Sequence, residues 1–282
     1  MSEPLVSVVV PAYQQPDLLR RVLKSIAMQD FSDYELIVSD DSRGDEVEAL
    51  VRQEAHAFPQ LLYVRNQPAK GSPQNWNHGM DQAKGRYLKI MHHDDWFAEP
   101  FALRLMVEAL QADERRLVFG GIKGFIEQDK RNVLNLPSMD WVRQIQEDPL
   151  QLLRGNLIGP PSTIMFKRQE ARFDPNLIWL VDIQFYLQLL LQGHRLHLLN
   201  QVLFENVQTA ASVTKRVEHD KHLNVYEYMY VAAKHARNRS LGWKIRHFTF
   251  VKKLVKGFGK VSYAELLSAY SKPEAYKKRV GL

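Results

Sequence analysis

The chain has 282 residues, of which 45% are hydrophobic and 25% are charged, a composition that excludes a disordered chain. It contains no cysteine, which excludes disulfide bonds and thiolate metal sites. The N-terminal sequence MSEPLVSVVVPAY has no basic region ahead of an apolar stretch, and no run of about eighteen apolar residues follows, so we expect neither a secretory signal nor a transmembrane helix.

The net charge of +6 is unevenly distributed. Residues 216–282 carry 15 Lys and Arg against 5 Asp and Glu, a net charge of +10, which leaves −4 on residues 1–215. Nucleic acid, an anionic membrane surface or a phosphate-bearing ligand would each explain a basic segment, as would a solvated surface. No base-reading motif accompanies it, so no nucleic acid is predicted as a partner.

The first half of the chain alternates strand and helix patterns. Residues 5–10 (LVSVVV) form a continuous β-branched run, typical of a strand covered on both faces, and this strand is predicted to stop at Pro11. A helix is predicted from Pro16, where apolar residues begin to recur at helical spacing. Further strands are predicted at residues 34–39, 61–65 and 87–91. This order predicts an α/β fold with a mostly parallel sheet flanked by helices.

Three polar clusters follow predicted strands: PAYQQPD, DDSRGD and HHDDW. In parallel sheets ligands bind beyond the carboxyl ends of the strands, so these clusters are expected to converge on one edge. No G-x-G-x-x-G follows the first strand and no P-loop is present, which argues against a dinucleotide-binding dehydrogenase.

Three segments, VSVVVPAYQQPDLLRRVLKSIAMQ, YELIVSDDS and NWNHGMDQAKGRYLKIMHHDDW, together resemble the nucleotide-sugar-binding half of a family 2 glycosyltransferase. The resemblance continues through WLVDIQFYLQLLLQG at residues 179–193. It implies a GT-A type, Rossmann-like, mostly parallel central sheet with a C-terminal helical extension. The implied parts are a nucleotide-sugar-binding half (1–110), an acceptor-binding half (111–216) and a basic helical extension (217–282).

The family resemblance also implies an activity. Such enzymes move a sugar from a UDP-, dTDP- or GDP-linked donor to a hydroxyl of a glycan or lipid-linked acceptor, with inversion and with a divalent metal. We therefore expect a hexosyltransferase of surface polysaccharide or glycolipid synthesis, cytoplasmic and peripheral on the inner face of the plasma membrane.

Donor-binding roles follow from the same resemblance. The turn after the first strand would face the nucleotide base, with Pro11, Ala12 and Tyr13. Asp40 and Asp41 would accept hydrogen bonds from the base or ribose, although Asp-Asp-Ser is also a frequent turn sequence.

The segment before the fourth strand is expected to reach the ribose or diphosphate through Asn75 and Asn77. Trp76 stands where family members commonly carry Arg, so the nucleotide contact of that Arg is not expected here, and Trp76 itself would fit the core.

HHDDW occupies the position of the family's D-x-D metal motif. Asp94 matches the last Asp and His92 replaces the first, so Asp94 and His92 are the predicted metal ligands, with Mn²⁺ or Mg²⁺ as the cofactor. The softer imidazole favours Mn²⁺, unless His92 contacts the diphosphate or sugar directly. His93 and Asp95 are assigned to donor binding, with a structural hydrogen-bonding role as the alternative for His93.

Inversion requires one base to take the acceptor proton, and the resemblance points to Asp182. It opens an apolar helical pattern, so helix capping is its alternative role. We expect the helix N-terminus to depress the Asp182 pKa. Val181 replaces the Glu that usually precedes this Asp.

Acceptor contacts are expected around Pro161, Ser162 and Thr163. Residues 195–216 are expected to form a strand pair that leads to a loop over the diphosphate. In this loop Thr214, Lys215 and Arg216 either donate to phosphate oxygens or are simply solvated. The mixed aromatic and basic sequence WKIRHFTFVKKLVKGFGK predicts a helix that lies on an anionic membrane.

Two rival classes stay open. A non-catalytic sugar-nucleotide or carbohydrate-binding protein would explain the missing acidic residues at His92 and Val181. A nucleotidyltransferase would usually show a Gly-rich basic loop after the first strand, which PAYQQPD does not provide.

Overall fold

The computed structural model describes residues 3–169, 171–208, 217, 220–236 and 240–282. Thr214, Lys215 and Arg216, predicted as phosphate contacts, lie outside these ranges. The elements in chain order are β1 (Val6–Ala12), α1 (Pro16–Ala27), β2 (Tyr34–Asp40), α2 (Glu46–Glu54), η1 (Ala55–Ala57), β3 (Leu61–Arg65), α3 (Gln74–Asp81), β4 (Tyr87–Ile90), β5 (Asp95–Phe97), α4 (Ala102–Ala112), β6 (Arg116–Ile126), β7 (Arg131–Asn135), α5 (Met139–Glu147), η2 (Pro149–Arg154), η3 (Pro161–Thr163), β8 (Ile164–Lys167), α6 (Val181–Leu191), β9 (Arg195–Gln208), α8 (Lys221–Ala236), α9 (Leu241–Val255), η4 (Lys256–Phe258), α10 (Tyr263–Ser271) and α11 (Pro273–Arg279).

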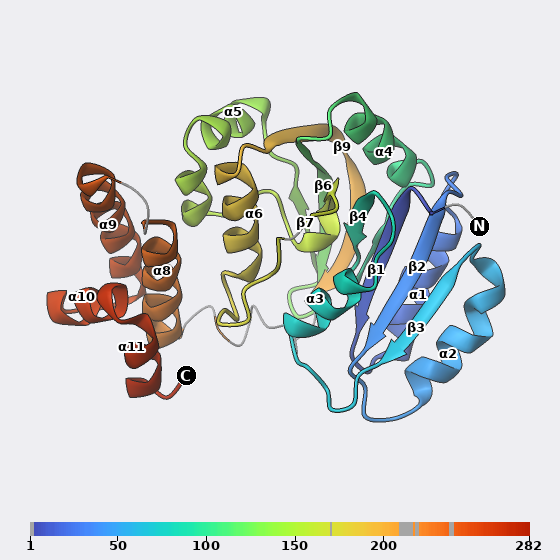
Figure 1. Cartoon of the computed structure of the whole chain (residues 1–282), viewed down its shortest axis with the longest axis horizontal. Helices are drawn as coiled ribbons and strands as arrows, with labels where there is room; N and C mark the ends of the chain where they lie inside the picture. Colours follow the sequence, from blue (N-terminus) through green and yellow to red (C-terminus); the bar gives the residue numbers. More distant parts are fainter. Residues whose placement is uncertain (1–2, 170, 209–216, 218–219, 237–239) are drawn as a thin grey trace.

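Within the described residues the strands form one nine-stranded sheet in the order β3-β2-β1-β4-β8-β6-β9-β5, with β7 paired to β6. The strands β3, β2, β1 and β4 are parallel, as predicted. Beyond β4 the sheet becomes mixed, because β8 runs antiparallel to both β4 and β6 while β9 is parallel to β6. The predicted α/β fold with a central sheet flanked by helices is confirmed (Figure 1).

Two hydrophobic clusters cover the two faces of the sheet. Along β1, Val8 and Val10 belong to one cluster and Val9 to the other, because successive strand residues point to opposite faces. The first cluster includes residues of α1, α2 and α4, and the second includes residues of α3, α5, α6 and the C-terminal helices. Burial on both faces explains why the strand sequences are continuously apolar.

The prediction that the first strand stops at Pro11 is wrong. β1 continues to Ala12, with Pro11 opposite Ser39 of β2. The Val9 carbonyl accepts from the Met91 N–H, so the main-chain groups of Val9 point toward β4. Pro11 lies two residues further along the strand, so its main-chain groups point to the same side. Pairing with β4 ends at Val9, so the missing Pro11 N–H costs no strand hydrogen bond.

Residues 195–208 form one long strand, and the predicted strand pair is wrong. β9 runs beside β6 throughout, and the register shifts where Gly120 pairs with Leu199 and Gly121 with Val202. The residues between Leu199 and Val202 are therefore taken up by a bulge instead of a turn. The other edge of β9 pairs with β5, a strand that the sequence did not predict.

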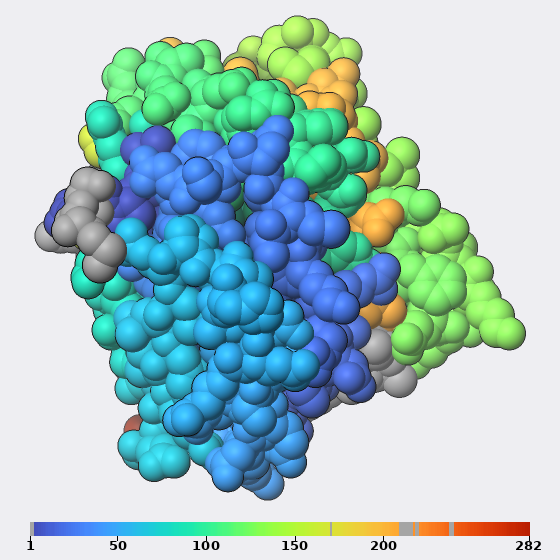
Figure 2. Space-filling model, turned by 90° about the vertical axis from the view of Figure 1, so that its right-hand side faces the viewer, coloured from blue at the N-terminus to red at the C-terminus, as the bar shows by residue number. Residues whose placement is uncertain are grey.

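The C-terminal helices α8 to α11 pack beside α6, on the left of Figure 1. Figure 2 shows a face built mainly from the N-terminal part of the chain, in blue, with later segments, in green and orange, along its upper and right edges. Across the described ranges, no helix combines the length and the apolar composition needed to cross a bilayer.

Candidate active site

The acidic pair that follows β2 is buried and hydrogen-bonded to the protein itself. Asp41 Oδ2 accepts from the Gly71 N–H at 2.7 Å. The Asp40 carboxylate accepts from the Ser42 N–H at 2.8 Å and from the Tyr63 hydroxyl at 2.7 Å. Burial, and secondly the bond to Asp40, raise the Tyr63 pKa. In this structure the pair fixes the turn after β2 and the segment that follows β3.

Two asparagines connect these turns to β1. Asn66 Nδ2 donates to Asp41 Oδ1 at 2.8 Å and to Asn75 Oδ1 at 3.0 Å, and Asn75 Nδ2 donates to the Ala12 carbonyl at 3.2 Å. Asn66 was not predicted, because an isolated Asn after a strand carries no motif. Pro11 and Ala12 are buried, so of the predicted turn residues Tyr13 is the one whose side chain is open to a ligand, 43% exposed.

The turn that carries Tyr13 is held in an unusual conformation. Gln14 and Gln15 have φ values of 55° and 53°, in the left-handed region that residues other than Gly enter infrequently. The Gln14 N–H donates to Ser42 Oγ at 2.7 Å, which ties this turn to the one after β2. The main chain at Tyr13 therefore lies beside the turn after β2, at the carboxyl edge of the sheet.

His92, Asp94 and Asp95 form a group, here called the metal group, whose potential ligand atoms all lie within 4.8 Å of one another. Among the described residues His92 Nε2 and Asp95 Oδ2 are buried without a hydrogen-bond partner. Two carboxylates and one imidazole suit Mn²⁺ or Mg²⁺. The structure thus places Asp95 beside the two residues predicted as ligands, and His93 lies partly exposed next to them in the sequence.

Electrostatics of the metal group also fit a bound cation. Burial raises the Asp95 pKa and the charge of Asp94 adds to this, while Ser162 and Asn206 oppose it. Burial lowers the His92 pKa to about 4, so its imidazole is neutral at pH 7 and keeps a lone pair for a metal. A cation would stabilise the ionised Asp95 that the protein alone disfavours.

A buried lysine that was not predicted as functional lies near Asp95 of the metal group. Lys89 is fully buried on β4, and Nζ donates to the carbonyls of Ile90, at 3.2 Å, and Ser162. Burial holds its pKa well below the usual range, and Asp95 opposes this shift. The sequence signal that could have identified Lys89 is a single charged residue inside the apolar strand YLKIM.

Asp182 lies in the first turn of α6. Its Oδ2 accepts from Asn156 Nδ2 at 2.7 Å and its Oδ1 from the Ile183 N–H at 2.7 Å. The predicted depression of its pKa is wrong: burial raises the pKa to about 6 and outweighs both hydrogen bonds. A carboxylate of this pKa is ionised at neutral pH yet basic enough to accept a proton.

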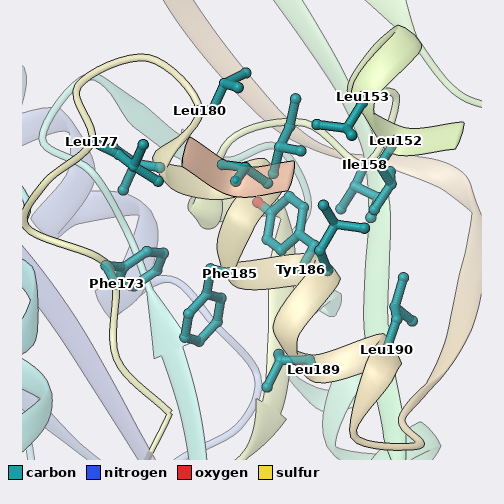
Figure 3. Close-up of a cluster of buried hydrophobic side chains, with 14 of the residues drawn as sticks. Leu152, Leu153, Ile158, Phe173, Leu177, Leu180, Phe185, Tyr186, Leu189 and Leu190 are labelled. Carbon is teal, nitrogen blue, oxygen red and sulfur yellow. The ribbon is translucent and has the colours of Figure 1, made fainter. Parts of the chain in front are cut away.

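Tyr186 of α6 lies close enough to Asp182 and to Asp95 of the metal group to respond to the charge of both. Its hydroxyl donates to the Gly159 carbonyl at 3.0 Å, and Asn156 Nδ2 donates to the same carbonyl at 2.9 Å. Burial, and then the charges of Asp182 and Asp95, raise the Tyr186 pKa. Figure 3 shows Tyr186 packed among apolar side chains of η2 and α6. Asp182 and the metal group therefore flank the same loop, residues 156–163.

The predicted acceptor residues support this loop. Ser162 and Thr163 are 0% exposed. Ser162 Oγ accepts from the His92 N–H at 2.8 Å, and Thr163 Oγ1 donates to the Ile158 carbonyl at 2.7 Å. Pro161 is buried as well. All three side chains are buried in this structure, and acceptor contact around this loop stays a prediction.

Asn77 and Trp76 lie on α3 and contact the loop that leads to α6. The Asn77 amide makes two hydrogen bonds to the Phe173 main chain, at 2.8 and 2.9 Å, which occupies the groups expected to reach the donor. The Trp76 ring lies 4.4 Å from the His92 ring and contacts Phe173 edge-on. Trp76 therefore packs against both the core and the metal group.

A pocket of about 450 Å³ opens on the other side of α3. Its lining is formed by residues 67–70 with Gln74, Asn77, His78 and Asp81. No residue of the metal group lines this pocket, so the pocket is separate from the candidate metal site.

The class of protein follows from the fold. Residues 1–349 of S. aureus TarS in complex with UDP-GlcNAc match with a TM-score of 0.68 and 17% identity, over 98% of this chain and 78% of that one. A mannosyltransferase of Pyrobaculum calidifontis in complex with GDP-Man and Mn²⁺ matches with a TM-score of 0.56 and 18% identity, over 98% and 84%. A longer TarS chain is covered to 45%. The chain has the GT-A glycosyltransferase fold.

The sequence comparisons identify the family. The model of glycosyl transferase family 2 matches residues 7–172, so the chain belongs to this family. An uncharacterized Mycobacterium tuberculosis protein is 28% identical over 77% of this chain and 71% of its own length. A Campylobacter jejuni GalNAc(5)-diNAcBac-PP-undecaprenol β-1,3-glucosyltransferase is 39% identical, over 33% of this chain and 30% of that enzyme.

Proposed function

We propose that this chain transfers a sugar from a nucleotide diphosphate sugar to a hydroxyl of a glycan or lipid-linked acceptor, with inversion. The observation that carries the proposal is that Asp182 and the metal group flank one loop at the carboxyl edge of the sheet. Similar proteins named for UDP-GlcNAc, GDP-Man and an undecaprenol-linked acceptor support the substrate classes.

Asp182 is the proposed general base. The acceptor hydroxyl donates its hydrogen bond to the carboxylate, its oxygen attacks the anomeric carbon, and the proton passes to Asp182. The bond from that carbon to the diphosphate oxygen breaks on the opposite face, so the anomeric configuration inverts. Asn156 holds Oδ2 in place while burial keeps the carboxylate basic.

His92, Asp94 and Asp95 would hold the divalent metal. A bound cation of this kind neutralises charge that develops on the departing diphosphate. Ser162 and Trp76 fix His92 from two sides, and Ser162 also contacts Asp95, so the ligands are preorganised.

Tyr13 is the proposed stacking surface for the nucleotide base, whether the donor carries UDP, dTDP or GDP. Asp40, Asp41 and Asn75 shape the turns around it. In this proposal residues 1–110 bind the donor, 111–216 the acceptor, and 217–282 form the basic extension.

The extension is the proposed membrane contact, at the inner face of the plasma membrane. On α9, Leu241 and Ile245 are 73% and 58% exposed and lie one turn apart beside Lys244. Apolar side chains flanked by Lys suit an anionic bilayer. Co-sedimentation with phosphatidylglycerol vesicles, but not with phosphatidylcholine vesicles, is expected and should be lost in Leu241→Gln/Ile245→Gln.

The test of the transferase function is nucleotide diphosphate release from a panel of UDP, GDP and dTDP sugars, with Mn²⁺, Mg²⁺ or EDTA. We expect slow metal-dependent release from one donor. Asp94→Asn should abolish it and Asp182→Asn should slow it by about 10²- to 10⁴-fold, while Asp140→Asn, on the exposed surface of α5, serves as the matched control.

Binding of a nucleotide without turnover in any condition, even with lipid-linked acceptors added, would overturn the transferase and favour the non-catalytic binding protein. Equal activity of Asp182→Asn and wild type would remove Asp182 from the mechanism.

A further inference from the structure

Residues 171–180 form the loop, here called the base loop, that connects β8 to α6 and ends two residues before Asp182. The C-terminal helix α8 presents three polar side chains to it: Glu227, Tyr230 and Lys234. Their spacing places them on one face of the helix. None of them was predicted as functional from the sequence.

Glu227 makes the principal contact. Its carboxylate is fully buried and accepts from the main-chain N–H groups of Ile178 at 2.5 Å, Trp179 at 2.9 Å and Leu180 at 2.7 Å. These N–H groups lie directly ahead of α6, where a helix leaves its first donors unpaired. The Glu227 carboxylate satisfies all three and so fixes the main chain that enters the Asp182 turn.

Tyr230 and Lys234 hold the other end of the base loop. The Tyr230 hydroxyl donates to Asp174 Oδ2 at 2.8 Å, and Lys234 Nζ donates to the same oxygen at 2.5 Å. Asp174 is 6% exposed, so the ion pair is shielded from solvent on this side.

The base loop is also fixed on the side that faces the metal group. The Phe173 main chain is paired with the Asn77 amide, and the Phe173 ring stacks on Phe185 of α6 with centroids 4.1 Å apart. Figure 3 shows Phe173, Leu177 and Leu180 along this loop beside α6. Since the base loop is held on both sides, the orientation of Asp182 at its end depends on the contacts that α8 makes with the loop.

We propose that Glu227 is a positioning residue for Asp182, so that the C-terminal extension helps to complete the catalytic site. The inference rests on the proposed function, because it assigns Glu227 a purpose in orienting the general base. Its effect is on the chemical step and not on donor binding, since among the described residues the Glu227 carboxylate hydrogen-bonds to the base loop and to no residue of the metal group or the Tyr13 turn.

Glu227→Gln tests this role. The variant keeps the size of the side chain but turns an NH₂ group toward main-chain N–H donors that need an acceptor. Displacement of a catalytic group by about 1 Å lowers turnover by up to roughly a hundredfold, so we expect kcat for donor hydrolysis to fall about 10- to 100-fold. The donor KM should stay within about twofold, since binding contacts are untouched. Hydrogen exchange at the amides of 178–180 should become faster.

Glu35→Gln is the matched control. Glu35 is another buried carboxylate that accepts from main-chain N–H groups, those of Lys84 and Gly85, but at the opposite end of the parallel strands. It should lower thermal stability without changing kcat or exchange at 178–180. Should Glu227→Gln not fold, Tyr230→Phe removes a single hydroxyl from the same contact surface and is expected to lower kcat by about threefold to tenfold.

The inference is overturned if exchange at 178–180 is unchanged in Glu227→Gln, or if its kcat falls no further than that of Glu35→Gln. An increase in donor KM with constant kcat would also overturn it, because it would place Glu227 in binding. Wild-type protein that releases no nucleotide from any donor marks failure of the proposed function instead, and removes the positioning role with it.

Discussion

At the scale of single residues, the surroundings of Asp182 make its carboxylate more basic, as the proposed role of general base requires. Its pKa is raised to about 6, so the fraction in the basic form falls as pH drops through that value. We expect kcat to be constant near pH 8 and to fall about tenfold per pH unit below pH 6. A pH series of donor hydrolysis on wild type measures this.

Asp182→Asn should lose about 10²- to 10⁴-fold in kcat and show no acidic limb, since an amide cannot take up the proton. The donor KM should stay close to the wild-type value. An acidic limb that persists in Asp182→Asn would assign the titration to another group.

The preference between Mg²⁺ and Mn²⁺ is also expected to depend on a single residue, His92. His92→Asp replaces a neutral nitrogen donor with a third carboxylate, which favours a hard cation. We expect the ratio of Mg²⁺ to Mn²⁺ affinity to rise roughly tenfold, the size of effect that a changed metal environment produces. Calorimetric titration of each metal is the measurement, and His93→Asn, outside the metal group, should keep the wild-type ratio.

At the scale of elements, α3 packs against the sheet through a glycine. A Cβ at Gly79 would lie 2.5 Å from Val9 Cγ1 and 3.3 Å from Ser39 Cβ, so Gly79→Ala must displace the helix from β1 and β2. We expect a loss of about 1–3 kcal/mol in unfolding free energy, measured by urea denaturation.

The matched control is Gly242→Ala in α9, where a Cβ would meet no atom within 4 Å. This change should be neutral or stabilising by up to about 1 kcal/mol, because Ala favours the helix. Equal effects of the two substitutions would show that close packing of α3 does not matter.

The packing of α9 makes stability depend on pH. His247 is 1% exposed, its ring nitrogens have no hydrogen-bond partner among the described residues, and burial lowers its pKa to about 4. An unfolded His titrates near 6.5, so the unfolded state binds the proton first as pH falls. Stability contributed by the neutral ring is therefore complete above pH 6.5 and is lost toward pH 4.

The loss attributable to His247 should approach about 3 kcal/mol between pH 7 and pH 4. Thermal melts of wild type and His247→Phe across this range measure it. The variant should be less sensitive to acid, and parallel curves for the two proteins would contradict the assignment.

At the scale of the whole molecule, the C-terminal helices share one hydrophobic cluster with α6 and the base loop. Tyr226, Met229 and Leu266 belong to the same cluster as Phe185 and Leu180. We expect one cooperative unfolding transition, with circular dichroism at 222 nm and tryptophan fluorescence changing together. An earlier loss of ellipticity would show that α8 to α11 unfold separately.

The sequence by itself determined the parallel strands, the polar clusters at their ends and the family. These follow from short-range patterns: continuous apolar runs, helical spacing after Pro16, and the acidic residues of HHDDW and WLVD. Such signals are local, so they survive without knowledge of distant partners.

Only the tertiary structure decided which polar residues face a ligand and which support the site. Ser162 and Thr163 proved to be buried supports, and the burial of Asp182 reversed the direction expected for its pKa. Asn156 and Glu227 gained their roles from contacts across 26 and 47 to 49 residues of sequence. Burial and long-range hydrogen bonding depend on the packing of segments far apart in the chain, which no local pattern contains.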